Sequence, residues 1–554
     1  MKMRLEKQYL VWGKLSLYKK LDYRWFFVLL VSLVAVGCPA PTLEEDPKIK
    51  ALSTGLDGID TVQPADLSDS PPVSVEQAAT EVTEQISEPN ESLPVIELTL
   101  EQVRAAALAS NLNLKIDLLD PAIAQRTVDV EWAKFEATFY GSAMYSVSET
   151  ETGASSTSNE YEAGVEAPLH TGGFISAGLP FGESDSDYSD GVADAAVSVS
   201  FIQSLLRGSG TRINTHSIRI AGYQKHAVDA RTKQAAINLL AEADIAYWSL
   251  FMACRELDVR REQYKLAQDQ LHHAQRKVAS GSSPRIEIVR SEAGLSRRIE
   301  AVINAETSVQ DRQIDLQRIM NNKDMPLNAD IRISTKTEPN PQGLEINEER
   351  LVGIALDNRM ETVRLELQMA IDELDIELAQ NATLPDLRFN YSFAAQTQAG
   401  DTGHALGDFG DKFSDNHSFG LSASIPLGNR AAKAQLERAR LQQLQNQAGY
   451  DRLRQMIQQD VYDAARALGN SWRRILAAEK SVDAAYRDYK VEQSQFQLGI
   501  RTSTDVLDSA TGLADAQLSR IRALAEYEIA QINLARATGT LLGRSRIILE
   551  PTDI

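Results

Sequence analysis

The chain has 554 residues, of which 43% are hydrophobic, and its 57 Lys and Arg against 77 Asp and Glu leave a formal charge of −20. That hydrophobic fraction is enough to bury a core, which excludes a wholly disordered chain, and the acidic balance argues against nucleic-acid binding, because such proteins need a basic surface to displace counterions. The two cysteines, Cys38 and Cys254, exclude a disulfide framework and a cysteine-rich metal scaffold.

The amino end carries an apolar run at residues 25–37, which is shorter than the ~20 residues that a spanning helix needs. Basic residues precede this run and small residues close it, so residues 1–37 are predicted to be a secretory signal peptide. The closing letters AVGC at 35–38 resemble a bacterial lipoprotein box, which implies that Cys38 is acylated and becomes the mature first residue. Pro39 is not the Asp associated with inner-membrane retention, which fits delivery to the outer membrane. The alternative is an ordinary signal peptide that happens to contain a cysteine.

Residues 38–97 show no hydrophobic periodicity. The stretch holds 13 Asp and Glu, only two Lys, and scattered prolines. Such a composition cannot bury enough apolar surface to offset chain entropy, so it is predicted to be a disordered acidic tether. A role as an acidic recruitment arm is the alternative to a plain solvated linker.

The remaining chain repeats one plan, with a first repeat at 98–338, a second at 339–545 and a tail at 546–554. A capping box of Thr99 and Gln102 opens a long helix in the first repeat, and Asn347 opens its counterpart in the second. Each opening helix is followed by strand regions that alternate polar with apolar or small residues, such as 192–202 and 418–425.

The first repeat holds a surplus of residues in its strand region. An extra hairpin accounts for this surplus, with strands at 161–167 and 174–179 around a turn that contains two glycines. The sequence leaves open whether this hairpin joins the other strands in one sheet.

Each strand region gives way to a very long helix, at 212–280 and 429–498, with no proline inside. Apolar residues recur at spacings of three and four along these helices, which predicts a coiled coil. Gly281 and Gly499 end the two rods at matched breaks, and returning helices follow at 284–320 and 503–538.

Strands at bilayer depth must close into a barrel, because lipid satisfies no backbone group, and one chain offers too few strands to close alone. Symmetric copies would therefore share one barrel, extended by a helical tube. The run GIRTSTDVLD at 499–508 resembles a periplasmic turn of the TolC family of outer-membrane efflux channels. Supporting matches are LP at 384–385, IPLG at 425–428, LLRGSG at 205–210 and LARATG at 534–539.

This resemblance implies a mainly α protein with a membrane β-barrel portion. Long antiparallel coiled-coil helices would form an α-barrel, and β-hairpins would contribute to an outer-membrane barrel shared by a homotrimer. The family usually has four strands per protomer and therefore twelve in the trimer, whereas six per protomer would give eighteen. The resemblance further implies an iris-like gate at the periplasmic end of the helical tunnel.

The gate residues follow from the same resemblance. Asp505 and Asp508 lie at i and i+3, so three copies would place two rings of carboxylates at the tunnel mouth and favour cations there. Arg501 matches the arginine that latches the gate, and Glu287 matches its acidic partner in the first repeat's turn. Phe496 stands where the family has a tyrosine that adds a second latch bond, and Pro284 is a further departure in the facing turn, which predicts a weaker or a different latch.

Each of these residues also has a plainer interpretation. Asp505 could be a carboxylate favoured by the helix dipole, and Arg501 with Glu287 could be an unpaired surface pair. No residues are predicted to be catalytic, to bind a metal or to hold a cofactor. His272 and His273 are adjacent on a helix and point to different faces, without a third zinc ligand.

The predicted function is therefore the outer-membrane channel of a tripartite export system, for drug efflux or type I secretion. Its partners would be outer-membrane lipid, a periplasmic adaptor and an inner-membrane RND or ABC pump. A non-transporting coiled-coil surface lipoprotein or adhesin is the alternative, and the duplicated hairpins and matched glycine turns argue against it.

Overall fold

The computed structural model of the chain describes residues 94–149, 154–187, 189–329, 331–400, 413–498 and 500–545. All of these residues belong to one of the chain's two compact units, which runs from Gln85 to Ile554. The expected signal peptide, the lipidation residue Cys38, most of the tether and the tail at 546–554 lie outside the described residues. Across the part that is described, no helix combines the length and the apolar character needed to cross a membrane.

Each repeat opens with short helices. Their bounds are α4 (Leu100–Ser110), α5 (Leu112–Asp117) and α6 (Asp120–Ala133) in the first repeat, and α10 (Glu348–Asn358) and α11 (Met360–Ala382) in the second. The capping box is formed as predicted, because the Thr99 side chain accepts from the Gln102 N–H while the Gln102 side chain accepts from the Thr99 N–H. A single long opening helix is wrong for both repeats, since Asn111 and Arg359 have extended ψ values of 130° and 131° and interrupt it.

A parallel two-stranded ladder joins the two ends of the first repeat. Strand β1 (Val95–Leu98) pairs with β6 (Arg332–Thr335). The predicted tether was expected to reach Glu97, so its last three residues, 95–97, belong to β1 instead. Each strand has only four residues, which is too short for alternation to be recognised, so neither strand is predicted from the sequence.

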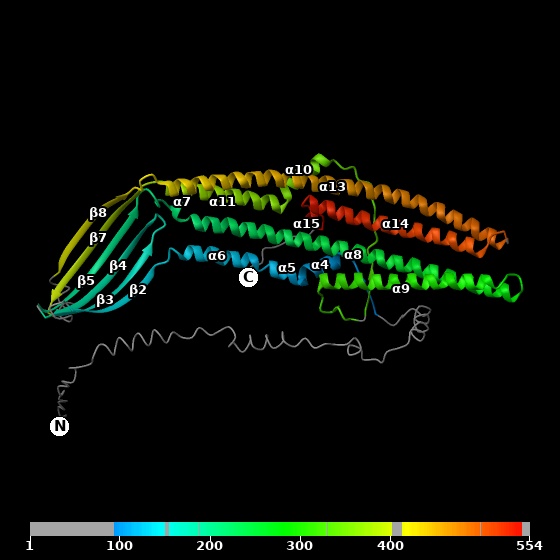
Figure 1. Ribbon diagram of the computed structural model, residues 1–554, viewed down its shortest axis with the longest axis horizontal. Helices are drawn as coiled ribbons and strands as arrows, with labels where there is room; N and C mark the ends of the chain where they lie inside the picture. The colour runs from blue at the N-terminus through cyan, green and yellow to red at the C-terminus, as the bar shows by residue number, and fades with distance from the viewer. Residues whose placement is uncertain are drawn as a thin grey trace, which may run out of the picture. The chain divides into compact units, whose positions relative to one another are not determined.

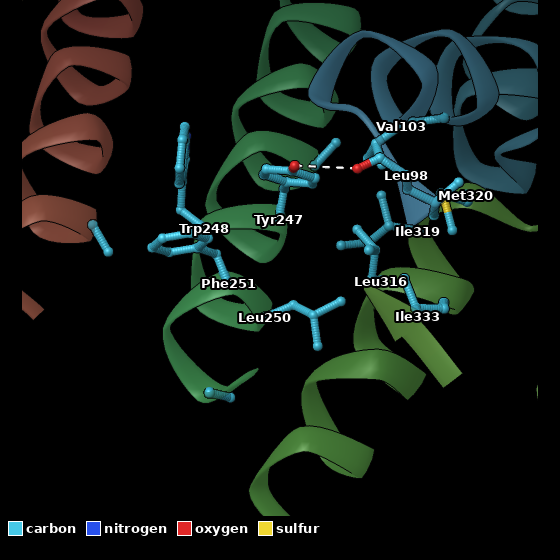
Figure 2. Packing of buried hydrophobic residues seen from close by; sticks show 14 of the residues in the cluster. Leu98, Val103, Tyr247, Trp248, Leu250, Phe251, Leu316, Ile319, Met320 and Ile333 are labelled. Carbon is cyan, nitrogen blue, oxygen red and sulfur yellow. Dashed lines mark hydrogen bonds between the residues drawn. The ribbon is translucent and has the colours of Figure 1, made fainter. Parts of the chain in front are cut away.

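The largest hydrophobic cluster packs this ladder against the middle of the long helix α8 (His216–Ala279), as Figure 2 shows. The Tyr247 hydroxyl donates to the Leu98 carbonyl at 3.2 Å and accepts from the Thr337 N–H at 2.8 Å. One turn earlier on α8, the fully buried Asp244 side chain accepts two hydrogen bonds of 2.7 Å from Arg104. These contacts fix the middle of α8 to both ends of the first repeat.

Two very long helices and their returning partners form two antiparallel hairpins (Figure 1). Helix α8 has 64 residues and returns through α9 (Ile286–Met320), and α13 (Arg430–Gln497) has 68 and returns through α14 (Ser503–Ala537). At ~1.5 Å per residue, each long helix extends for ~100 Å. The buried side chains of α13 recur at spacings of three and four, from Ile457 to Ala478, which is the narrow coiled-coil stripe that the sequence predicts.

The two hairpins pack on each other through α8 and α14. Arg522 of α14 lies 3.3 Å from a Glu256 oxygen of α8, and Gln263 donates to the Ala510 carbonyl at 3.1 Å. Nearer the sheet, α8 contacts both α6 and α11, and α11 contacts α13, so four helices lie abreast there. The short helices α7 (Thr211–Asn214) and α15 (Leu541–Arg544) adjoin α8 and α14.

Six antiparallel strands form one sheet in the order β2, β3, β4, β5, β7, β8 (Figure 1). Their bounds are β2 (Thr138–Glu149), β3 (Ser155–Pro168), β4 (Gly173–Ser186), β5 (Ser189–Ser204), β7 (Asp386–Ala399) and β8 (Ser414–Ser424). The extra hairpin is real and consists of β3 and β4, whose turn is closed by a 2.8 Å hydrogen bond from the Leu169 N–H to the Gly173 carbonyl. The sequence left open whether this hairpin joins the other strands, and it does join them in one sheet of six strands, because β3 and β4 have strand partners on both sides.

Candidate functional site

The two hairpins end in turns that share an equivalent closing hydrogen bond. In the first turn Gly281 has φ +72° and the Ser282 N–H donates to the Lys277 carbonyl at 2.8 Å. In the second, the Ile500 N–H donates to the Gln495 carbonyl at 2.9 Å, which is the equivalent bond one repeat later. Both are the closing bond of a glycine-ended helix. Gly499 itself, the expected glycine of the second turn, lies outside the described residues.

Asp505 caps the helix that leaves the second turn. Its Oδ2 accepts from both the N–H and the hydroxyl of Thr502 at 2.9 Å, while the Thr502 Oγ1 accepts from the Asp505 N–H at 3.3 Å. The backbone hydrogen bond from Thr502 is the largest cause that lowers the pKa of Asp505 below its usual value. Asp505 is therefore ionised at neutral pH, and it completes the capping box of α14.

Asp508 lies one turn further along α14 and is exposed. Burial and the positive charge of Arg260 lower the pKa of Arg298 of α9. The negative charges of Asp515 and Asp508 act in the opposite direction and raise that pKa. Arg298 in turn donates to the Thr511 hydroxyl at 2.5 Å. The two acidic residues of the motif thus differ, since Asp505 is tied into a cap and Asp508 is free to face solvent.

The expected latch pair, Arg501 with Glu287, is not formed within the single chain. Arg501 Nε lies 3.2 Å from Glu492 Oε2 and donates to Gln495 Oε1 at 3.0 Å, whereas Glu287 Oε1 pairs with Arg290 Nη1 at 3.0 Å. Each residue has a closer partner on its own hairpin, which is the physical reason. Both nevertheless line one hollow of about 240 Å³ between the two turns.

A different contact joins the two turns across that hollow. The Lys277 ammonium of α8 lies 4.1 Å from the centre of the Phe496 ring of α13, which is the geometry of a cation–π interaction. The Ser503 hydroxyl adds a 3.3 Å hydrogen bond to Gln270 of α8. Phe496 could be recognised in the sequence as a departure from the family, but Lys277 could not, because nothing in one sequence indicates which cation reaches a ring on another helix.

One face of the sheet is mostly apolar in the half nearer the helices and the opposite face is mostly polar, as cross-strand rows show. One row of paired residues runs Phe139, Val165, Ala177, Val199, Phe393, His417. The adjacent row, whose side chains point to the opposite face, runs Thr138, Glu166, Ser176, Ser200, Ser392, Ser418. Alternation of this kind is typical of strands between lipid and an aqueous lumen.

Length and exposure agree with that interpretation. The shortest of the six strands has 11 residues and the longest 16, whereas a tilted transmembrane strand needs about 9–11. On the two outer strands the apolar face is bare, with Phe139 74% and Phe419 71% exposed. A soluble sheet would cover such side chains, so this face needs an apolar surrounding.

Other chemistry-bearing residues are dispersed. Among the described residues, no group of three or more His, Cys, Asp and Glu side chains is arranged to hold a metal ion. His273 has the Arg276 guanidinium 3.1 Å from its Nδ1, and burial raises the pKa of Cys254 to about 11. Neither residue lies in a reactive arrangement.

Comparison with known proteins shows what these features are similar to. Residues 351–540 match the family described as "Outer membrane efflux protein". The chain is 23% identical to the outer membrane protein TolC of Escherichia coli K12 over 374 residues, which cover 64% of this chain and 73% of that protein. The family resemblance predicted from the sequence is confirmed, and the members of this family are passive channels of the outer membrane rather than enzymes.

Solved structures show the same fold. A membrane protein from Pseudomonas aeruginosa has a TM-score of 0.62 at 18% identity, over 81% of this chain and 92% of the other. The CmeC outer membrane channel of Campylobacter jejuni also has a TM-score of 0.62, at 15% identity, over 80% of this chain and 86% of the other. The mainly helical architecture with a strand region is thus confirmed.

Proposed function

We propose that this chain, whose residues 351–540 belong to the outer membrane efflux protein family, is the exit duct of a tripartite export system. One observation carries the proposal: a two-faced, six-stranded sheet is continued directly by helices of 64 and 68 residues. The sheet suits a bilayer, and the ~100 Å helices suit a passage through the periplasm. A coiled-coil surface protein would have no use for the apolar sheet face.

The duct would be a homotrimer, because one open sheet cannot satisfy its edge strands within lipid. Its partners would be a periplasmic adaptor, docking near Gly281 and Gly499, and an inner-membrane pump of the RND or ABC class. Acylation of Cys38 after removal of residues 1–37 would anchor the chain in the outer membrane through the acidic tether. No cofactor is required, since the duct itself performs no chemistry.

The turns would form the iris-like gate. Three copies of Asp505 and of Asp508 would ring the mouth and concentrate cations there. The Lys277–Phe496 contact at 4.1 Å and the Ser503–Gln270 hydrogen bond at 3.3 Å would hold the two hairpins in the closed arrangement. Glu287 lines the same hollow as Arg501 and would pair with it if the turns move.

Single-channel recording in planar bilayers tests this function. The double variant Asp505→Ala with Asp508→Ala should conduct but lose its preference for cations, seen as a reversal potential near zero in a salt gradient. Asp451 is an exposed acidic residue in the first half of α13, away from the turn. Asp451→Ala is therefore the matched control and should keep the preference for cations. Unchanged selectivity in the double variant would refute the role of the carboxylate rings. A purified chain that forms no pore would refute the proposed duct itself.

A further inference from the structure

The six-stranded sheet has two open edges, and they are complementary. Strand β2 pairs only with β3, and β8 only with β7, among the described residues. All five neighbouring pairs in the sheet are antiparallel, so β2 and β8 run in opposite directions. A second copy placed with its β2 beside β8 would therefore continue the antiparallel pattern without interruption.

The strands are also staggered in a regular way. The row of paired residues that begins at Thr138, the first residue of β2, ends at Ser418 of β8. Strand β8 nevertheless continues to Ser424, six residues closer to the helices. Since β2, β5, β7 and β8 each join a helix within a few residues, their ends lie at one depth, and the stagger measures the tilt of the strands.

This stagger fixes the register at the open edges. A closed barrel repeats the same stagger in every copy, so the helix-side end of the second copy's β2 lies at the depth of the helix-side end of β8. The row that starts at Thr138 in the first copy therefore meets the second copy's β2 six residues further on, at Met144. Ser424 then lies opposite Thr138 of the second copy, and Ser414 lies opposite Ser148. The whole of β8 is paired after this shift, and because the shift is even, apolar Phe419 meets apolar Ala143 on the same face.

We propose that β8 of one copy pairs with β2 of the next in this register, and that three copies close a barrel of eighteen strands instead of the usual twelve. This inference rests on the trimer proposed above. One residue of stagger per strand, ~3.3 Å over a spacing of ~4.8 Å, gives a tilt of ~35°, which is within the range of transmembrane barrels.

The girth of such a barrel matches that of the helical tube. At that tilt each strand occupies ~5.9 Å of circumference, so eighteen strands span ~105 Å and twelve only ~70 Å. Four helices abreast in each of three copies give twelve helices, and at ~8–10 Å apart these span ~95–120 Å. The extra hairpin β3–β4 therefore brings the barrel to the width of the tube, so that the exit is no narrower than the tunnel.

Disulfide cross-linking in the full-length protein, in outer-membrane preparations, tests the register. Ser418→Cys with Met144→Cys samples the polar face, and Phe419→Cys with Ala143→Cys samples the apolar face, so one pair is of the non-hydrogen-bonded class with closer side chains. On oxidation at least one pair should give bands of two and three chains. The single variants, which control for Cys38 and Cys254, should give none.

Mismatched pairs separate this proposal from its rivals. Ser418→Cys with Ser142→Cys or with Ser146→Cys is displaced by two residues, and a better cross-link there would overturn the register. Cross-links from Ser418→Cys to Ser176→Cys or Ser184→Cys of β4 would overturn eighteen strands in favour of twelve, while leaving the trimer and the duct intact. A chain that stays monomeric in detergent would overturn both proposals.

A strand count on the unmodified protein covers the case in which the cysteine variants do not assemble. Electron cryomicroscopy of the trimer viewed along its axis should show eighteen strands. Twelve strands, with the β2–β3 hairpin outside the wall, would refute the inference.

Discussion

The contact between Lys277 and Phe496 offers a direct measure of what holds the two turns together. Lys277→Gln removes the charge but keeps most of the side-chain stem, so it deletes the cation–π interaction across the 4.1 Å gap. Lys277 is exposed, and such a contact contributes ~0.5–1 kcal/mol at exposed sites. If three copies open in one step, three contacts break together, and the loss of ~1.5–3 kcal/mol raises the ratio of open to closed channels about 10- to 150-fold.

The assay is open probability in planar bilayers, with a set of variants that isolates the interaction. Phe496→Leu should raise the open fraction about as much as Lys277→Gln does, and combining the two should add little, because both remove one contact. Phe496→Tyr keeps an aromatic face and should remain mostly closed. Lys265→Gln, another exposed lysine of α8, should change nothing.

Two results would refute this reasoning. One is a fully additive effect of Lys277→Gln and Phe496→Leu on the free energy of opening, which would mean that the two residues act independently. The other is an equal rise for Lys265→Gln, which would make general surface charge the cause. Either result would leave the hydrogen bond from Ser503 to Gln270 as the remaining contact between the two turns.

Three further predictions concern the framework that supports the turns. Arg104→Ala leaves the buried Asp244 carboxylate unpaired and should lower the free energy of unfolding by ~3–5 kcal/mol in denaturant titrations. Arg126→Ala removes the exposed Arg126–Asp129 pair and should change that free energy by less than ~1 kcal/mol. Similar losses for both variants would contradict the role of burial. Gly539→Ala places a Cβ 2.9 Å from the Asn358 backbone at φ +71° and should lower the melting temperature, while Gly353→Ala on the exposed side of α10 has nothing within 4 Å and should raise or preserve it. Burial raises the pKa of Cys254 to about 11, so its thiol stays neutral at pH 8. Mass spectrometry should therefore find Cys254 alkylated by iodoacetamide only after unfolding. Rapid labelling of the native protein would contradict this, because it would show that the thiol is accessible.

The long helices and the strand alternation could be predicted because each is written in a local pattern. The rods expected at 212–280 and 429–498 correspond to α7 with α8 (His216–Ala279) and to α13 (Arg430–Gln497), since periodicity persists over many turns. The four-residue strands β1 and β6 could not be predicted, because their pairing depends on residues more than 230 positions apart, as between Val95 and Arg332. The breaks at Asn111 and Arg359 depend on backbone angles that either residue could avoid in another context.

The turn chemistry shows a similar division. Thr502 and Asp505 are three residues apart, and their capping box could be recognised from the spacing alone, although the family resemblance assigns Asp505 to the gate. The partners of Arg501 and Lys277 depend on how two separate hairpins come together at the hollow. Family resemblance supplied a partner for Arg501 that this chain places elsewhere, because Glu492 is closer.

The pairing of β5 with β7 has a consequence for the order in which the protein folds. This pairing places Ser204 beside Arg388, and both helices of the first hairpin lie between these residues in the chain. Strand β7 is therefore available to pair with β5 only after both helices have been made. Loop closure over such a distance adds little to the equilibrium free energy but slows folding. Strands β2 to β5 can form a meander first, and during that interval β5 presents a long unpaired edge of the kind that promotes aggregation. In hydrogen-exchange measurements during refolding, β3 and β4 should therefore gain protection before β7. The species that is prone to aggregate is the chain in which β7 has not yet paired with β5.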